Sequence, residues 1–130
     1  MKITILIIIF LNSFLLLSEV NSWECGKFNG AKIIAQDGTY LGEIGPNWKT
    51  DSIFNDSSKY SSTWSSESVF NSSSKHGNSY SSTSVFNDSA SNPPLIISES
   101  GEVIGKLSVG PSWDDSRYHP FDIKYTCDWD

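Results

Sequence analysis

The chain has 130 residues, with 15 acidic and 9 basic side chains that give a formal net charge of −6 at neutral pH. A surface of this charge repels nucleic-acid phosphates and anionic lipid headgroups, which argues against nucleic-acid binding and against membrane binding by charge. The length suffices for one domain with one modest hydrophobic core.

The N-terminal segment over residues 1–22 has the features of a secretory signal peptide. Lys2 is followed by an apolar run over residues 3–17, and Val20 and Ser22 are small residues before a predicted cleavage site. The apolar run is shorter than the roughly 20 apolar residues of a membrane-spanning helix. We therefore predict a signal peptide over residues 1–22 and a single secreted or periplasmic domain over residues 23–130, with no membrane span in the mature chain.

Residues 33–48, IIAQDGTYLGEIGPNW, predict a first β-hairpin. Asp37 and Gly38 lie between two apolar runs, and this dipeptide is a strong signal for a tight turn between antiparallel strands. A single hairpin is only marginally stable in water, so this hairpin is expected to pair or stack with another element.

Residues 51–98 form three successive repeat units of equal length: DSIFNDSSKYSSTWSS (51–66), ESVFNSSSKHGNSYSS (67–82) and TSVFNDSASNPPLIIS (83–98). Each unit carries Ser-[Ile/Val]-Phe-Asn, and an aromatic residue precedes each β-branched residue by five positions. This spacing suits a hydrophobic staple before one helical turn that ends at the Asn. A short strand at Ser-Val-Phe-Asn is the alternative, because β-branched and aromatic residues favour strands. Each unit is too short to bury its own apolar face, so the units are expected to pack on one another or on the hairpins.

Residues 96–113, IISESGEVIGKLSVGPSW, repeat the pattern of the first hairpin, with Ser100 and Gly101 at the turn. Residues 121–127, FDIKYTC, predict a further strand at the C-terminus. The predicted fold class is α+β, mainly β, in which two hairpins and a C-terminal strand surround the repeats. The predicted core consists of Ile33, Ile34, Leu41, Ile44, Ile96, Ile97, Val103, Ile104, Leu107, Ile123, Tyr125 and the repeated Phe residues.

The two cysteines, Cys25 and Cys127, lie near the two ends of the predicted mature chain. An exported protein meets an oxidising compartment, so a disulfide between these residues is the expected pairing. A redox or metal-binding pair is the alternative, but such sites usually show a C-x-x-C motif or a His beside the Cys, and both are absent here.

The first hairpin, the repeat units and the exit SNPPLII (residues 91–97) together resemble a family of small secreted or periplasmic bacterial proteins. Members of this family carry tandem Ser/Asn/Tyr repeats flanked by β-hairpins. The resemblance covers residues 33–107. It implies a fold and no specific activity.

Only His76 and His119 are candidates for an ordinary general base, and neither lies in a recognisable setting for a Ser-His-acid site. His76, beside Gly77 in a polar segment, is interpreted as a solvated turn residue, and His119 is expected to order the turn before Pro120. We predict a non-enzymatic protein without a cofactor. A small secreted hydrolase is the alternative, and it requires a cleft in which one of these His residues lies next to an acid and a Ser.

Asn55, Asp56, Asn87 and Asp88 place oxygen ligands at matching positions of the first and third units. A calcium-binding extracellular structural protein is therefore a further alternative. The same residue types are ordinary turn formers, and the chain contains no calcium-loop motif, so no metal site is predicted. Asn55, Asn71 and Asn87 also each begin an Asn-x-Ser glycosylation sequence.

Five Trp and five Tyr exceed the needs of a core of this size. Exposed aromatic rings beside Asn, Asp and Ser suit the binding of a sugar or a peptide, although the same rings also serve as staples and lids of a core. We predict a binding or cell-envelope-associated module whose partner is an envelope component, a carbohydrate or a protein. The candidate ligand-binding residues are Trp48, Trp64, Tyr80 and Trp113.

Overall fold

The computed structural model describes residues 19–111 and 113–130, and it confirms an α+β fold. Residues 1–18 of the predicted signal peptide lie outside this range. No helix within the described residues is long and apolar enough to cross a membrane. In chain order the elements are η1 (Ser22–Glu24), α2 (Cys25–Phe28), β1 (Ala31–Ile34), β2 (Tyr40–Ile44), β3 (Leu95–Ile97), β4 (Val103–Leu107), β5 (Arg117–Tyr118) and α3 (Pro120–Thr126).

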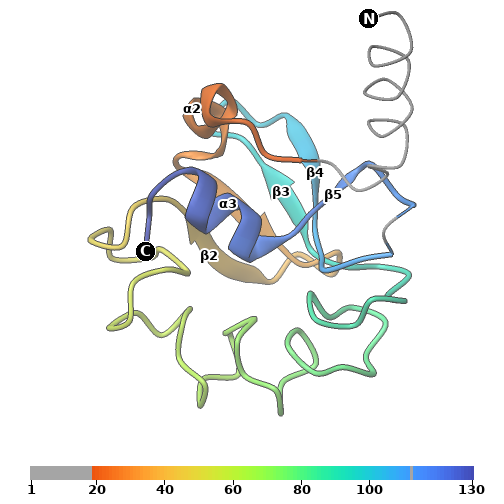
Figure 1. Ribbon diagram of the computed structural model, residues 1–130. Coiled ribbons are helices and arrows are strands. Elements are labelled where there is room, and N and C mark those ends of the chain that lie inside the picture. The colour runs from red at the N-terminus through yellow and green to blue at the C-terminus, as the bar shows by residue number, and fades with distance from the viewer. Residues whose placement is uncertain (1–18, 112) are drawn as a thin grey trace, which may run out of the picture.

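The five strands form one mixed sheet in the order β2-β1-β3-β4-β5 (Figure 1). Both predicted hairpins are confirmed, and they pair edge to edge through β1 and β3, where Ile33 lies opposite Ile96. Each hairpin turn contains a glycine with a positive φ, 93° at Gly38 and 91° at Gly101, a conformation that glycine adopts without steric cost. The final pair, β4 with β5, is parallel.

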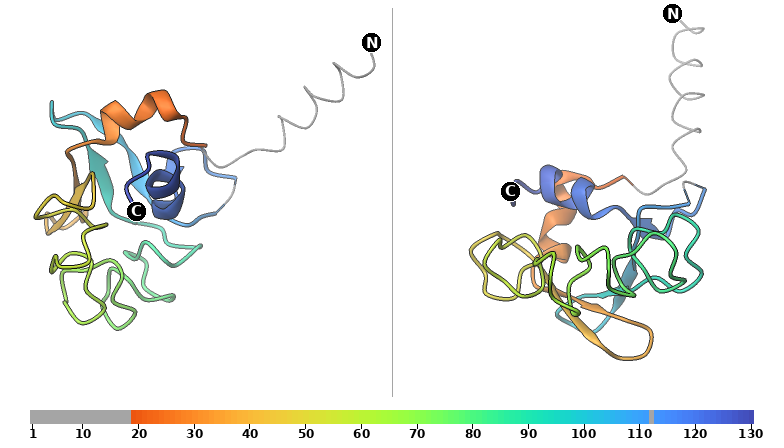
Figure 2. Two further views of the ribbon diagram at one scale, coloured as in Figure 1. Left: turned by 60° about the vertical axis from the view of Figure 1, so that its left-hand side comes forward. Right: turned by 90° about the horizontal axis from the view of Figure 1, so that it is seen from below.

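The C-terminal segment is a helix, so the predicted strand over residues 121–127 is wrong. Helix α3 starts at Pro120, whose fixed φ suits the first helical position, and the ring nitrogen Nδ1 of His119 accepts a hydrogen bond from the Phe121 N–H at 3.1 Å. This local capping outweighs the alternation of apolar and polar residues that favoured a strand. Figures 1 and 2 show α3 between α2 and the segment that follows β2.

The predicted disulfide between Cys25 and Cys127 is confirmed, with a Cα–Cα distance of 5.6 Å. It joins the first residue of α2 to the residue that follows α3. The two ends of the described chain are therefore held on the same side of the sheet.

The segment over residues 51–98 consists mostly of linked β-turns, which the ribbon of Figure 1 shows as successive loops below the sheet. The Ser52 N–H donates to the Lys49 carbonyl, and the Asn55 N–H donates to the Ser52 carbonyl. The Ser58 N–H in turn donates to the Asn55 carbonyl, and the second unit has the same three hydrogen bonds at the equivalent positions. The short strand considered for Ser-Val-Phe-Asn is therefore wrong, and the single helical turn is replaced by a series of β-turns.

Side chains supply the hydrogen bonds that fix these turns. Each repeated Asn donates its amide Nδ2 to the carbonyl six residues earlier, and its Oδ1 accepts the N–H two residues later. Short polar side chains that bond to nearby backbone compete with helix and sheet formation, which explains the turn conformation. The three amide bonds join Asn55 to Lys49 at 2.8 Å, Asn71 to Ser65 at 3.0 Å and Asn87 to Ser81 at 2.9 Å.

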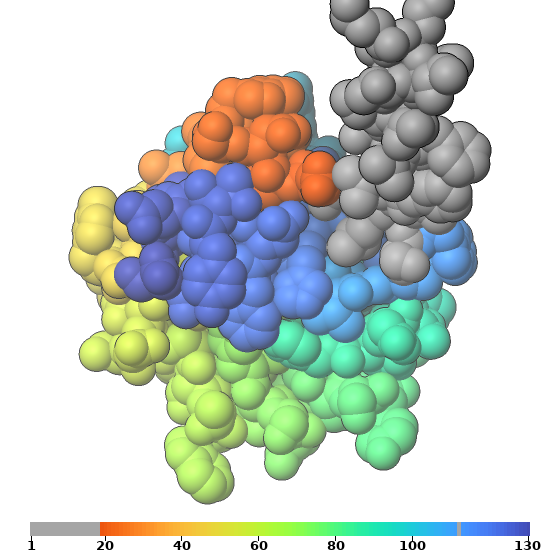
Figure 3. Space-filling model, in the orientation of Figure 1, coloured from red at the N-terminus to blue at the C-terminus, as the bar shows by residue number. Residues whose placement is uncertain are grey.

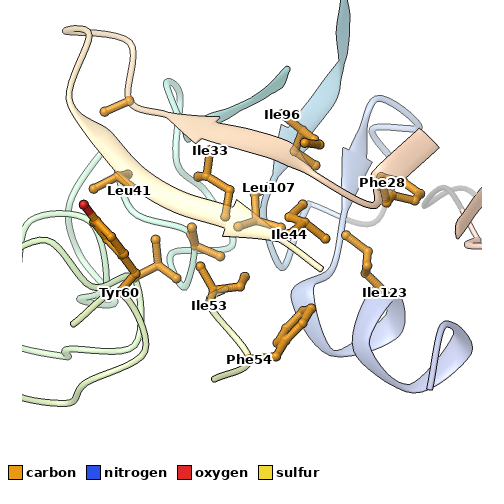
Figure 4. Close-up of a cluster of buried hydrophobic side chains, with 14 of the residues drawn as sticks. Phe28, Ile33, Leu41, Ile44, Ile53, Phe54, Tyr60, Ile96, Leu107 and Ile123 are labelled. Carbon is orange, nitrogen blue, oxygen red and sulfur yellow. The ribbon is translucent and has the colours of Figure 1, made fainter. Parts of the chain in front are cut away.

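One hydrophobic core joins the turns to the sheet and to α3 (Figure 4). The β-branched residue of each unit is buried in it: Ile53, Val69 and Val85. Six predicted core residues are fully buried, namely Ile33, Leu41, Ile44, Ile96, Leu107 and Ile123. Val103 and Tyr125 are exposed, contrary to the prediction, and the buried Phe28 was not predicted.

Candidate functional site

A row of aromatic rings runs along the face where the turns meet α3. We call Phe54, Phe70 and Phe86, one from each unit, the Phe column. Phe70 lies 5.7 Å from Phe86 between ring centroids, and both rings contact Phe121 of α3, at 5.8 Å and 6.1 Å. Phe121 also stacks near the exposed Tyr125. The Phe column is therefore only partly covered by α3, and Phe70 and Phe86 remain half-buried.

Two hollows flank Phe70. The first groove has a volume of about 240 Å³ and lies between the first two units, with Phe121 and Lys124 of α3 in its lining. The second groove has a volume of about 370 Å³ and lies between the second and third units. Their linings correspond position by position with an offset of one repeat unit: Phe54 and Phe70, Asp56 and Ser72, Ser61 and Gly77, Thr63 and Ser79, Phe70 and Phe86. The grooves are thus equivalent sites that share one aromatic wall.

The second groove has no charged side chain in its lining. Oδ1 of Asn78 accepts the N–H groups of Tyr80 at 2.8 Å and Ser81 at 2.6 Å, which fixes the turn and leaves the amide Nδ2 without a partner among the described residues. Nor do the hydroxyls of Ser72 and Ser79 have a hydrogen-bond partner within residues 19–111 and 113–130. Neutral donors and acceptors therefore line a groove with two phenyl walls.

The first groove carries one acidic and one basic side chain, which the second groove lacks. Asp56 is exposed at its rim, and the Lys124 ammonium lies 6.0 Å from the centroid of the Phe54 ring. The Oγ of Ser61 donates to the Asn55 and Ser58 carbonyls, so this hydroxyl serves the turn. Thr63 is the free hydroxyl of this groove among the described residues, at the position that Ser79 has in the second groove.

The structure exposes all four predicted ligand-binding residues but does not bring them into one site. Trp48, Trp64, Tyr80 and Trp113 are 75%, 91%, 91% and 71% exposed. Tyr80 lines the second groove, Trp48 borders a separate hollow beside Asp51, and Trp113 borders a third hollow that contains Arg117. The sequence did not predict the groove hydroxyls or Asn78 as site residues. For Thr63 and Ser79 the sequence held a signal, because each follows a repeated Phe by nine residues.

The buried Arg117 holds the loop that carries Trp113. Its Nε donates to Asp114 at 2.8 Å and its Nη1 donates to the Gly110 carbonyl at 2.8 Å. Hydrogen bonds from Ser116 and then from Arg117 hold the pKa of Asp114 far below its ordinary value. The guanidinium is thereby neutralised by its own loop.

His76 is not the solvated turn residue that the sequence suggested, because its side chain is buried with 2% exposure. Its Nδ1 has no hydrogen-bond partner among the described residues, and burial, followed by the nearby Lys75 charge, lowers its pKa. It lines neither groove. His119 uses its Nδ1 to cap α3, as expected for a residue that orders its turn. The described residues therefore do not place either His in a groove beside an acid and a Ser.

The Asn oxygens considered as calcium ligands already serve the turns. Oδ1 of Asn55 accepts the Ser57 N–H at 2.9 Å, and Oδ1 of Asn87 accepts the Ser89 N–H at 3.0 Å. Asp56 and Asp88 are not enclosed by further acids, and no group of three or more His, Cys, Asp or Glu side chains suited to a metal occurs in the described part of the chain. The amide nitrogen of each glycosylation sequence is likewise engaged in its turn.

Comparison of the chain with protein-family models, with curated proteins and with solved structures finds no match. The resemblance to small secreted or periplasmic bacterial proteins with tandem repeats flanked by β-hairpins therefore stays a prediction. A function for this chain must be inferred from the geometry of its grooves.

Proposed function

We propose that this protein is a secreted, non-enzymatic recognition module that binds an extended component of the cell envelope along its two grooves. The observation that carries this proposal is the positional equivalence of the grooves, which repeat the same walls and the same hydroxyl position in successive units. Apolar walls with a few oriented polar groups are typical of binding sites. Export is supported by the signal-peptide pattern and by the disulfide, which persists in oxidising compartments.

Co-sedimentation of the disulfide-bonded protein with washed bacterial envelope fragments and with purified cell-wall sacculi tests this proposal. We expect the protein to sediment with at least one of the two, and Tyr80→Ala to reduce the bound fraction several-fold. Tyr80 is almost fully exposed and lines the second groove, so its truncation removes contact area without disturbing the core. Trp23→Ala is the matched control, because Trp23 is also highly exposed but lies in η1, outside the grooves. Equal sedimentation of the two variants, or no sedimentation of the native protein, would contradict the proposal.

A further inference from the structure

The lining of the second groove favours an uncharged ligand. Its polar groups are the Ser72 and Ser79 hydroxyls and the Asn78 amide, all uncharged, and its walls are the rings of Phe70 and Phe86. The whole chain carries a net charge of −6, and Asp56 stands at the rim of the first groove. A polyanion gains no counter-charge in the second groove, the single Lys124 of the first groove is accompanied by Asp56, and the net charge of the chain repels a polyanion at longer range. An uncharged ligand with apolar surfaces and many hydroxyl groups fits this lining.

The backbone around the groove does not favour a peptide. A peptide that adds to a protein as an extended strand needs an edge of unpaired N–H and C=O groups. In the second groove the N–H groups of Gly77 and Asn78 already donate to the Ser74 carbonyl, and the Tyr80 N–H donates to Asn78 Oδ1. A sugar ring needs no such edge, because its C–H face packs on an aromatic ring while its hydroxyls bond to side chains at the rim.

The two grooves are close enough for one ligand chain. Phe70 lines both grooves, so the two grooves adjoin at this ring. Figure 3 shows the turn region as lobes divided by notches along one edge of the molecule. A ligand that occupies one groove therefore presents its next units to the other, and the second contact becomes intramolecular.

From these observations we infer that the ligand is an uncharged polysaccharide whose single chain lies across both grooves, with sugar rings on the two sides of Phe70. The inference rests on the proposed function of the grooves and adds the chemical class of the ligand and its placement across both grooves. Thr63 and Ser79 are the equivalent hydroxyls that bond to the chain in the first and second grooves.

Isothermal titration of the intact, disulfide-bonded protein with three uncharged series tests the inference: cello-, chito- and malto-oligosaccharides from disaccharide to hexasaccharide. We expect one series to bind, with an affinity that rises by roughly tenfold or more between the disaccharide and the hexasaccharide, as expected for linked contacts. Thr63→Ala and Ser79→Ala should each weaken hexasaccharide binding about threefold to tenfold, the loss of one hydrogen bond to a neutral group. Trp23→Ala should leave it unchanged.

The outcomes separate the ligand class from the proposed function. If the protein sediments with envelope material through Tyr80 but binds none of the three series, or binds poly-L-proline or polygalacturonate instead, the glycan inference is overturned and the recognition function stands. If oligosaccharides bind with the same affinity at every length, or only one of the two hydroxyl variants weakens binding, a single chain across both grooves is excluded. If neither envelope material nor any oligosaccharide binds, the proposed function itself fails.

Discussion

Single polar side chains decide the path of the repeated turns. Asn71 is buried, donates to the Ser65 carbonyl and accepts the Ser73 N–H, so one side chain closes bonds on both sides of its backbone. Ser68 adds a further bond by accepting the Phe70 N–H at 3.0 Å. These contacts explain how a segment rich in Ser and Asn holds an ordered conformation without a helix or an extended sheet.

His76 is the residue at which pH should act on stability. Its burial holds its pKa below the ordinary value of 6.5, so it is neutral in the folded state, while the unfolded chain takes up a proton as the pH falls below about 6.5. Because the unfolded state then binds more protons, this contribution to the free energy of unfolding is present above pH 6.5. It is lost as the pH falls toward the lowered pKa, by up to about 1.4 kcal/mol per pH unit.

Urea denaturation between neutral and mildly acidic pH measures this loss. His76→Tyr and His76→Asn introduce the residues that the first and third units have at the equivalent positions, Tyr60 and Asn92. In both variants the loss of stability on acidification should be smaller, because the protonation of His76 in the unfolded chain no longer contributes to it. His119, whose pKa is also lowered by burial, remains in both proteins and cancels in the comparison. Of the charged groups near His76, Asp37 does not titrate in this range, because hydrogen bonds from Thr39 keep its pKa at about 2. An unchanged pH dependence in both variants would show that His76 is accessible to protons in the folded state.

Among the helices and strands, the sequence correctly predicted the two hairpins, because residues within each turn determine them. The Asp-Gly and Ser-Gly pairs identified both hairpins, and the spacing of the apolar residues identified their buried faces at Ile33, Ile96 and Leu107. Helix α3 was missed because FDIKYTC alternates like a strand, while the cap that starts the helix involves the side chain of His119. The choice between these two conformations depends on one hydrogen bond and on contacts with Phe70 and Phe86 that are distant in sequence.

Of the residues that line the two grooves, the sequence predicted only Tyr80 as a ligand-binding residue. The repeat period gave Trp48, Trp64 and Tyr80 the same position, and all three are exposed. The grooves themselves arise from packing between units, which the sequence of one unit does not specify. Neither a single helical turn nor a strand has the chain path of linked β-turns, so the recurrence of Thr63 and Ser79 nine residues after a Phe could not by itself place these hydroxyls in a groove.

Substitution of Gly77 tests how tightly the backbone of the second unit is packed. A Cβ at this position would lie 2.3 Å from the Asn71 carbonyl oxygen and 2.6 Å from the Val69 carbonyl oxygen, so the backbone of the unit must shift to admit it. Gly77→Ala should lower the free energy of unfolding by more than about 1 kcal/mol, in the range of overpacking changes in a tight interior. Chemical denaturation measures this loss.

Gly26→Ala is the matched control. No atom lies within 4 Å of a Cβ at Gly26, which belongs to α2, and alanine favours a helix over glycine by about 1 kcal/mol. This variant should be neutral or more stable than the native protein. A Gly77→Ala variant as stable as Gly26→Ala would show that the close contacts at Gly77 are relieved without cost.

For the whole molecule, the disulfide joins two helices on one side of the sheet across a sequence separation of 102. Removing it with Cys25→Ser and Cys127→Ser should lower the free energy of unfolding by about 2–5 kcal/mol, mainly because the unfolded chain regains conformational freedom. A reductant should reduce the stability of the native protein to that of the double variant and should not affect the variant. A double variant as stable as the oxidised protein would show that the sheet and α3 alone hold the ends together.

Counted from Lys49, Ser65 and Ser81, each period of the turn region contains both partners of its Asn amide bond. A further copy of the period could therefore be inserted by tandem duplication of the coding sequence with its internal bonds already complete. Each insertion would add one further groove of the kind that lies between successive units. The number of grooves on the molecule would thus be set by the number of repeat copies that the gene encodes.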